Sequence, residues 1–432
     1  MTAATDQLDA VSRPSRFTLE GLGHCCVAMM FLSSFFVVWE PAACDLLFFA
    51  AVPCFLFSGI RLSPAVGLLF AGLIIYNICG LASYIQLNGD SIPLGEAKDK
   101  TGTWVFTSFY MSMSAVFLAA YIAEDPERRF QFIMKYFYWA ATIASVLGLI
   151  GYFHITSFAK NLLVFERIVS TFKDPNVFST YLVLPGVTLF ISLVTGRMPM
   201  TLLNVGRMLI IAAALFLAFS RGAWTDFVLA SLLAITLSFL MSPSRQQRDS
   251  IVLKLVLALV AMGLLLFVLL SVPTIRDLFL DRFTLVKEYD AGEMGRFGNQ
   301  RNSIPMLLER PFGFGPLHFT DHFRENPHNT FINAFSSFGW FGGAAFITLV
   351  VLYIGAFIKA AMTRSSFQAS AIVVGACLVA ILAQGVQIDT EHWRHLYYLI
   401  GITWGFFAAT LERDHRNEPQ EAYLAGWRGL IK

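Results

Sequence analysis

One histidine and several arginines are the side chains of this chain best suited to chemistry on an anionic substrate. His328 follows a long polar stretch, Pro273–Pro327, and stands where the next apolar run begins. Histidine titrates near neutral pH and can take a proton from a hydroxyl. Arg221 stands between two apolar runs in the tripeptide Ser-Arg-Gly. Because a guanidinium keeps its charge and binds phosphate through two parallel hydrogen bonds, these residues indicate proton transfer beside a bound anion.

The composition identifies an all-α polytopic membrane protein. Hydrophobic residues make up 56% of the 432 residues and charged residues 14%, against about 25% charged in soluble domains. The net charge of +2 gives no support to nucleic-acid binding, so no nucleic-acid partner is expected. No cleavable signal peptide is expected, because the polar start is followed by an apolar run long enough to span. Six cysteines without a C-x-x-C pair are interpreted as small buried hydrophobic residues: Cys25, Cys26, Cys44, Cys54, Cys79 and Cys377.

About twelve membrane-spanning helices are predicted, at about 20 residues per crossing. They fall near residues 22–39, 42–60, 64–85, 103–123, 132–153, 177–195, 202–220, 223–241, 251–272, 329–358, 369–388 and 395–411. The Lys and Arg residues of the short loops gather on one side, which predicts that this side and both termini are cytoplasmic. The chain then divides into a cytoplasmic segment 1–21, spans 1–9 over 22–272, a large periplasmic loop 273–328 with short helices, spans 10–12 over 329–411 and a cytoplasmic tail 412–432.

This topology brings the candidate chemistry to the side opposite the cytoplasm. The loops that fall there are 86–102, 154–176, 220–223, 273–328 and 389–394. They carry the polar residues of greatest interest, which are Lys173, Arg221, Arg296, Arg301, His328, Asp389, Glu391, His392 and Arg394. The sequence therefore predicts one site at the outer face rather than charges scattered through the membrane.

Several of these residues also admit a purely structural role. Arg221 could snorkel from a helix end to the interface, and Asp226 could orient or neutralise it. The segment Gly295–Glu309 has the apolar spacing of a short amphipathic helix on the membrane surface. The basic residues of that helix, Arg296 and Arg301, could then be merely solvated.

Three further residues have similar alternatives. Lys173 precedes Asp-Pro-Asn, an ordinary turn and helix-start signal, yet it could add to a phosphate site. Asn329 could cap the helix that follows it. Arg394 could contact an anion or pair with Glu391.

Neither a metal nor another cofactor is expected. The pairs His318/His322 and His392/His395 have ligand-like spacing, but no third ligand accompanies them. The sequence has no Walker motif, no G-x-G-x-x-G and no H-E-x-x-H, so a nucleotide-driven reaction within this chain is unsupported.

Four segments together resemble the O-antigen ligase and Wzy-type polysaccharide polymerase superfamily. They are Ser170–Tyr181 (STFKDPNVFSTY), Phe219–Trp224 (FSRGAW), Arg296–Gly315 (ending ERPFGFG) and His328–Gly343 (HNTFINAFSSFGWFGG). The resemblance implies a GT-C-like, all-helical glycosyltransferase of the bacterial inner membrane. It also implies a donor glycan on an undecaprenyl-pyrophosphate carrier and an active site that faces the periplasm.

The resemblance also implies roles for particular residues. Arg221 and Arg296 match the arginines taken to hold the pyrophosphate, and His328 matches the histidine proposed to activate the acceptor hydroxyl. The segment after Arg296 departs from the usual tryptophan-containing form, so either Arg296 or Arg301 could face the phosphates. Further candidates for binding the pyrophosphate or the glycan are Lys173, Asn329 and Arg394. A metal is then unnecessary, because fixed guanidinium groups can stabilise the charge on an activated leaving group.

The acceptor distinguishes a ligase from a polymerase. It is a lipid A-core sugar for a ligase and another carrier-linked glycan for a polymerase, which is slightly favoured because many such proteins serve capsule or exopolysaccharide pathways. Implied partners are this donor and acceptor, membrane lipid, a flippase and a chain-length regulator. The alternative function is a lipid-linked glycan transporter or flippase without catalysis. Transporters often place ionisable groups near the midplane of repeated halves, whereas these charges gather at one face and no repeat is visible.

Overall fold

The computed structural model describes residues 18–89, 97–283 and 295–416, which form a bundle of α-helices, as predicted. The first helices are α1 (Leu19–Ser33), α2 (Ala43–Phe57), α3 (Pro64–Gly89), α4 (Ala97–Glu124), α5 (Pro126–Tyr152), α6 (Pro175–Tyr181), α7 (Val183–Thr195) and α8 (Leu202–Leu217). The others are α9 (Arg221–Met241), α10 (Arg245–Leu270), α11 (Pro273–Phe283), α12 (Arg296–Leu308), α13 (Thr330–Met362), α14 (Gln368–Gln384) and α15 (Arg394–Arg416).

A small hairpin and two short 3-10 helices complete the described elements. The hairpin pairs β1 (Leu163–Val164) antiparallel to β2 (Arg167–Ile168), with Val164 opposite Arg167. The 3-10 helices are η1 (Ala159–Leu162) and η2 (Phe319–Asp321). The hairpin lies in a segment that the sequence assigned to an outer loop.

Every predicted span coincides with helix in the structure. Among the described residues, 7 helical segments are long and apolar enough to cross a membrane: Pro64–Leu87, Lys100–Glu124, Pro126–Tyr152, Pro175–Thr195, Arg221–Met241, Arg245–Leu270 and Thr330–Met362. The helices α1, α2, α8 and α14 are apolar but shorter. The polytopic class is therefore confirmed, while twelve crossings and a GT-C-like fold stay predictions.

Several predicted spans extend beyond the helices found there, and two of the observed helix ends make specific contacts. The helix in span 22–39 ends at Ser33, and the next residue, Ser34, donates its hydroxyl to Phe31 O at 2.7 Å. The helix in span 42–60 begins at Ala43, where the Asp45 carboxylate accepts the backbone N–H of Ala42 at 2.8 Å. Side-chain hydrogen bonds of this kind satisfy backbone groups that a helix end leaves open.

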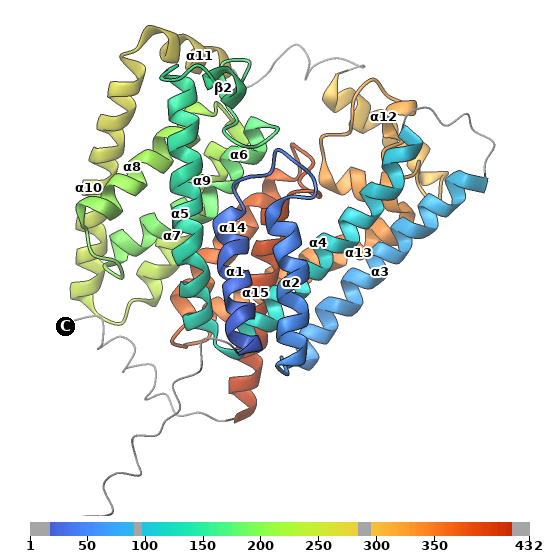
Figure 1. Ribbon diagram of the computed structural model, residues 1–432, viewed down its shortest axis with the longest axis horizontal. Coiled ribbons are helices and arrows are strands. Elements are labelled where there is room, and N and C mark those ends of the chain that lie inside the picture. Colours follow the sequence, from blue (N-terminus) through green and yellow to red (C-terminus); the bar gives the residue numbers. More distant parts are fainter. Residues whose placement is uncertain (1–17, 90–96, 284–294, 417–432) are drawn as a thin grey trace, which may run out of the picture.

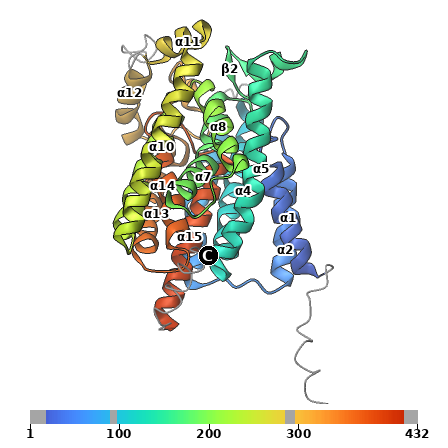
Figure 2. The ribbon, with the colours of Figure 1, turned by 90° about the vertical axis from the view of Figure 1, so that its left-hand side faces the viewer.

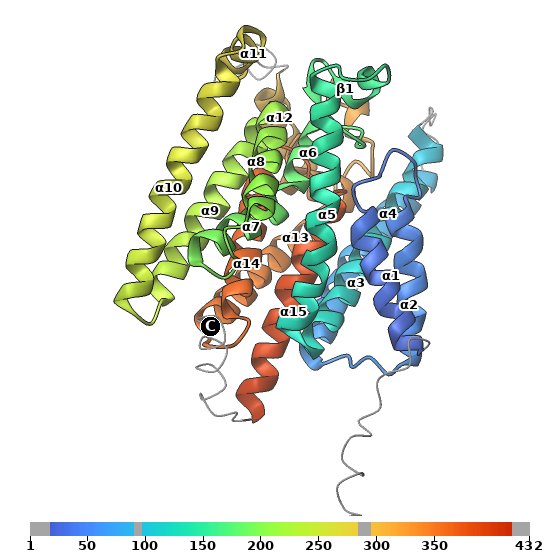
Figure 3. The same cartoon turned by 60° about the vertical axis from the view of Figure 1, so that its left-hand side comes forward.

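The polar segments of the chain gather at one end of the bundle. In Figure 1 the hairpin, α11 and α12 lie at the upper end, and they remain there when the molecule is turned. The views in Figures 2 and 3 also show α10 along one flank of the bundle. The described residues of the loop regions 154–176 and 273–328 therefore lie at the same end of the bundle.

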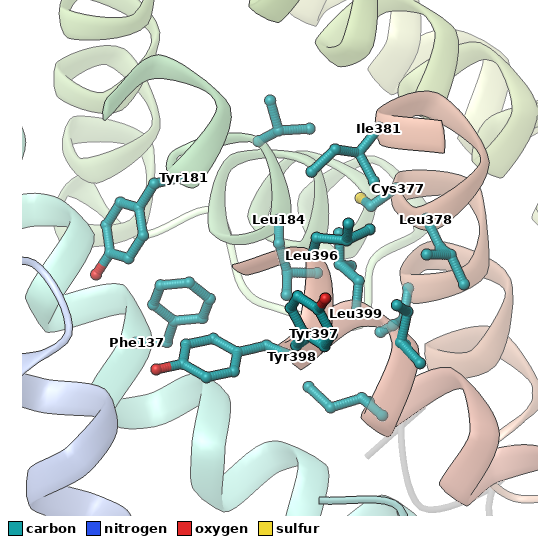
Figure 4. Close-up of a cluster of buried hydrophobic side chains, with 14 of the residues drawn as sticks. Phe137, Tyr181, Leu184, Cys377, Leu378, Ile381, Leu396, Tyr397, Tyr398 and Leu399 are labelled. Atoms are coloured by element: carbon teal, nitrogen blue, oxygen red, sulfur yellow. The ribbon is translucent and has the colours of Figure 1, made fainter. Parts of the chain in front are cut away.

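A buried apolar cluster ties the N-terminal helices to the C-terminal ones beneath this end (Figure 4). Tyr181 of α6 packs its ring 5.0 Å from that of Phe137 on α5. The Tyr181 hydroxyl also forms a 2.8 Å hydrogen bond with Ser34 Oγ. Ile381 of α14 and Leu396 of α15 belong to the same cluster. Close packing of such side chains gives the outer loops a rigid base.

Gly339 interrupts α13 and provides the docking place for the large loop. Its backbone has φ 71° and ψ −170°, a conformation that is essentially restricted to glycine. A Cβ atom there would lie 2.3 Å from Pro311 O. The loop is fixed beside this break, because Phe314 N donates to Ser336 O at 2.8 Å and Trp340 N donates to Pro311 O at 2.9 Å.

We expect Gly339→Ala to destabilise the protein by about 3 kcal/mol or more, because it combines backbone strain with a steric clash. The matched control is Gly355→Ala in the same helix, where no heavy atom lies within 4 Å of the added Cβ. That variant should keep or slightly raise stability, by up to about 1 kcal/mol. Thermal unfolding in detergent measures both, and equal stability of the two variants would contradict this account of the break.

Candidate functional site

A cavity of about 300 Å³ lies at the end of the bundle that carries the hairpin and the large loop. Four arginines line it, each from a different element, and Glu325 is the one carboxylate among the described residues of its wall. The complete lining is Arg167, Asn176, Phe219, Ser220, Arg221, Gly222, Arg282, Arg296, Glu325, Gln384, Gln387 and Ile388. Walls of predominantly one sign concentrate ions of the opposite sign, so the cavity suits an anion.

A strained turn presents Arg221 to the cavity. Phe219 has φ 48°, a left-handed conformation that is uncommon for a residue other than glycine. Ser220 then caps α9, since its Oγ accepts the N–H of Ala223 at 3.4 Å, and Arg221 is the first residue of the helix. At Gly222 a Cβ would lie 2.4 Å from Gln384 Nε2, so a larger residue there would require the Gln384 side chain of α14 to move. The Ser-Arg-Gly sequence thus combines a cap, a cation and a close contact.

Arg167 of β2 belongs to the same wall and was not singled out from the sequence. Its Nε donates to Ala218 O at 2.9 Å, immediately before the turn that carries Arg221. Its Nη2 donates to Asn176 Oδ1 at 2.9 Å. Asp174 in turn caps α6, accepting the N–H of Asn176 at 2.6 Å, which confirms the helix start predicted from Asp-Pro-Asn. The signal available in the sequence was an arginine just before the STFKDPN segment in an outer loop.

Aromatic packing brings Arg282, the second arginine missed from the sequence, to the cavity. The Trp224 ring of α9 stacks on Phe216 at 5.4 Å between centroids and lies 5.6 Å from Phe279 of α11. Arg282 follows Phe279 by three residues, which places both on one side of the helix. The packing of α11 over the start of α9 therefore positions a cation that local sequence patterns do not reveal.

Of the two arginines on α12, Arg296 lines the cavity and Arg301 does not. Arg296 is the first residue of α12, and its Nη1 donates to Gln387 O at 3.4 Å. Arg301 is exposed on the side that carries Phe297 and Ile304, both also exposed. Arg221 and Arg296 both stand at helix N-termini, where the helix dipole adds to the attraction for an anion.

His328 stands at the edge of the cavity, next to its carboxylate. Its Nε2 lies 4.0 Å from Glu325 Oε2, and about a third of the side chain is exposed. The backbone is left-handed at φ 46°, which places strain directly before α13. His328 is not part of the cavity lining, but its imidazole is partly exposed beside Glu325, which is.

Asn329 and Thr330 attach the chain just after His328 to the turn that follows α14. Asn329 Oδ1 accepts the N–H of Ile332 at 3.0 Å, which confirms the predicted cap, and its Nδ2 donates to Val386 O at 3.1 Å. Thr330 N donates to Gly385 O at 2.7 Å. These bonds hold His328 against the same turn that contributes Gln387 and Ile388 to the cavity, while a substrate-binding role for Asn329 stays a prediction.

A buried polar network lies behind this turn. Asn333 Nδ2 donates to Asp389 Oδ2 at 2.7 Å and to Glu391 Oε2 at 3.1 Å, and the Tyr76 hydroxyl donates to Glu391 Oε1. Burial raises the pKa of Asp389 to about 6. Burial, together with the neighbouring Asp389 charge, raises the pKa of Glu391 well above its usual range. The hydrogen bonds fix the turn between α14 and α15 against α13.

The two histidine pairs make other contacts. His318 Nδ1 lies 2.6 Å from Asp321 Oδ2. The His392 ring lies 4.1 Å from that of Trp104, and burial lowers its pKa to about 4. In the part of the chain that the structure describes, no group of three or more His, Cys, Asp or Glu residues could hold a metal ion.

Lys173 and Arg394, both predicted as substrate contacts, lie outside the cavity lining. Lys173 Nζ pairs with Glu40 Oε1 at 2.9 Å on the surface. Arg394 forms a bidentate ion pair with Asp45. Its Nε lies 2.8 Å from Oδ1 and its Nη2 lies 2.7 Å from Oδ2. Asp45 also accepts the Tyr110 hydroxyl at 2.6 Å. The alternative pairing of Arg394 with Glu391 is not what the structure shows, and the substrate roles of Lys173 and Arg394 stay predictions.

Comparison with known proteins supports the resemblance for three of the four segments, since Ser170–Tyr181 precedes the matched stretch. Residues 207–347 match the family model described as O-antigen ligase. The matched stretch contains Arg221, Arg282, Arg296 and His328, while Arg167 precedes it. No curated protein matches the chain.

The contact between Arg394 and Asp45 predicts a strong effect on stability. Their side chains are 18% and 5% exposed, so Arg394→Gln leaves a buried carboxylate unpaired and should cost about 3–5 kcal/mol. The double variant Asp45→Asn/Arg394→Gln removes both charges and should recover part of that loss. Thermal unfolding in detergent gives the coupling energy. A double variant that is stable yet cannot bind substrate would instead assign Arg394 to the substrate.

Proposed function

We propose that this chain, whose residues 207–347 match the O-antigen ligase family, is a glycosyltransferase of the bacterial inner membrane. It moves a glycan from an undecaprenyl-pyrophosphate carrier onto a sugar hydroxyl at the periplasmic face, in O-antigen or exopolysaccharide assembly. One observation carries this proposal: an arginine-lined cavity has an accessible histidine at its rim. The cavity suits the leaving group, and the histidine suits the nucleophile.

The surface below the cavity supports a lipid-borne donor over a water-soluble one. Along α9, Arg221 is followed at helical spacing by Thr225, Val228 and Leu232, which are all exposed. Val228 is 63% and Leu232 62% exposed, and both lie within a candidate membrane span. Apolar side chains exposed in such a span contact lipid. A pyrophosphate held at Arg221 can therefore keep its polyprenyl tail in the membrane along this helix.

The reaction is a displacement at the anomeric carbon of the donor sugar. The acceptor oxygen forms a bond to that carbon while the bond from carbon to pyrophosphate oxygen breaks, and the leaving oxygen takes the electron pair. His328 accepts the proton of the acceptor hydroxyl. Arg221 and Arg296 stabilise the negative charge that develops on the pyrophosphate, which makes a metal unnecessary. A single displacement inverts the configuration at the anomeric carbon.

A second carrier-linked glycan is slightly favoured as the acceptor, which would make the enzyme a polymerase. The ground is the frequency with which such proteins serve capsule or exopolysaccharide pathways, and a lipid A-core acceptor remains the direct alternative. Both acceptors use the same donor chemistry, because each presents a sugar hydroxyl to His328.

Arg221→Ala and His328→Ala should each lower glycan transfer by about 100-fold or more, because they remove charge stabilisation and the base respectively. Arg221→Lys should also be poor, since lysine lacks the planar fork of the guanidinium. The control is Arg276→Ala on α11, whose side chain is 56% exposed and pairs with the adjacent Asp277. Transfer is measured in proteoliposomes at equal protein levels, and normal product from either alanine variant would remove that residue from the mechanism.

A reconstituted assay with and without lipid A-core identifies the acceptor. Purified protein receives a carrier-linked oligosaccharide, and we expect longer carrier-linked chains in the absence of lipid A-core. Glycan found only on lipid A-core would establish a ligase. Linkage analysis of donor and product should show inversion, and retention would exclude a single displacement. Absence of transfer with authentic substrates would favour a transporter or flippase.

A further inference from the structure

The cavity contains more guanidinium groups than the two already assigned to the pyrophosphate. Arg221 and Arg296 come from α9 and α12, whereas Arg167 comes from β2 and Arg282 from α11. Four cations from separate elements converge on one space of about 300 Å³. Positive charges around one small cavity repel one another. Four of them together therefore favour an anionic ligand larger than a single phosphate.

Arg167 is held in place before any ligand arrives. Its Nε and Nη2 donate to Ala218 O and Asn176 Oδ1, both at 2.9 Å. Ala218 adjoins the turn that carries Arg221, so the Arg167 guanidinium is fixed relative to the backbone of that turn. Preorganised donors of this kind bind an anion without a further cost of ordering the side chain.

Arg282 supplies an independent observation. Its Nε is buried and has no hydrogen-bond partner among the described residues, and the closest carboxylate oxygen that pairs with it, on Asp281, is 3.9 Å away. Buried donors in proteins are nearly always satisfied. A buried donor without an acceptor, on a side chain that lines the cavity, indicates that a ligand provides the acceptor.

We infer that Arg167 and Arg282 bind one phosphate of the donor while Arg221 and Arg296 bind the other, so that the site selects a lipid pyrophosphate over a lipid monophosphate. This inference rests on the lipid-pyrophosphate donor of the proposed function. Each phosphate of the diester donor carries one negative charge, and loss of the glycan adds a further charge to the departing group. Two guanidinium groups for each phosphate supply positive charge for both the bound donor and the departing group, and each can donate parallel hydrogen bonds to phosphate oxygens.

A structural role is the competing explanation for Arg167, because its bonds to Ala218 and Asn176 also attach the hairpin to the start of α9. Such a role predicts lower stability and equally weaker binding of every ligand. A role in binding the second phosphate instead predicts a weaker preference for pyrophosphate over monophosphate. The ratio of pyrophosphate to monophosphate affinity therefore separates the two explanations.

The experiment measures binding of farnesyl pyrophosphate and farnesyl monophosphate to the full chain in nanodiscs. We expect wild type to prefer the pyrophosphate. Arg167→Gln and Arg282→Gln should each weaken pyrophosphate binding about tenfold or more, the effect of losing a hydrogen bond to a charged group. Monophosphate binding should change by less than about threefold, because the remaining pair still holds one phosphate. Arg276→Gln, on the same helix as Arg282, is the matched control and should leave both affinities unchanged.

Equal weakening of both ligands in Arg167→Gln and in Arg282→Gln, or unchanged selectivity in both, would overturn the inference. Arg167→Lys adds a further check, since it keeps the charge without the fork and should recover only part of the selectivity. Binding is read without transfer, so the two proposals can fail separately. Selective binding without glycan transfer would refute the enzyme alone, whereas transfer with unaltered selectivity in both glutamine variants would refute the second-phosphate assignment alone.

Discussion

Four arginines line one cavity and repel one another. The elements that carry them must be held together against this repulsion. Arg167 is held by a backbone carbonyl and an amide oxygen, and Arg296 contacts the carbonyl of Gln387. The Arg394 guanidinium instead pairs with a carboxylate, that of Asp45. These contacts distinguish two kinds of arginine among the described residues. One kind pairs with a carboxylate inside the bundle, and the other lines the cavity.

The backbone contacts of the residues that follow His328 fix its position at the rim of the cavity. The strained conformation of His328 precedes a helix whose first turn is fixed to the end of α14 through Asn329 and Thr330. Gly339 then ends this first part of α13 and allows the loop from Pro311 to pack against it. A short rigid segment therefore lies between two anchors, which limits how far the imidazole can move relative to the cavity.

Hydropathy and capping signals in the sequence predicted the helices and some of their N-terminal caps. Every predicted span contains helix, and the caps at Asn329 and Asp174 follow from residues beside the helix starts. The site residues that were not predicted from the sequence are positioned by contacts between segments far apart in the chain. Arg167 reaches the site through a hairpin, and Arg282 through aromatic packing between α9 and α11. The pairing of Arg394 with a carboxylate on α2 is equally long-range. No local period encodes such contacts, whereas the Ser-Arg-Gly turn carries its own signal.

The exposed face of α12 bears on where the cavity would lie relative to a membrane surface. This helix turns small polar residues, Asn299 and Ser303, toward the protein and leaves Phe297, Ile304 and Leu308 exposed. Such an arrangement is unfavourable in water and favourable where an apolar face can enter the membrane surface. If that face enters the membrane surface, Arg296, at the start of the same helix, lies near the plane of the lipid headgroups. Under the proposed function, a carrier lipid would hold its phosphates at that plane, so the donor would reach the arginines without leaving the membrane.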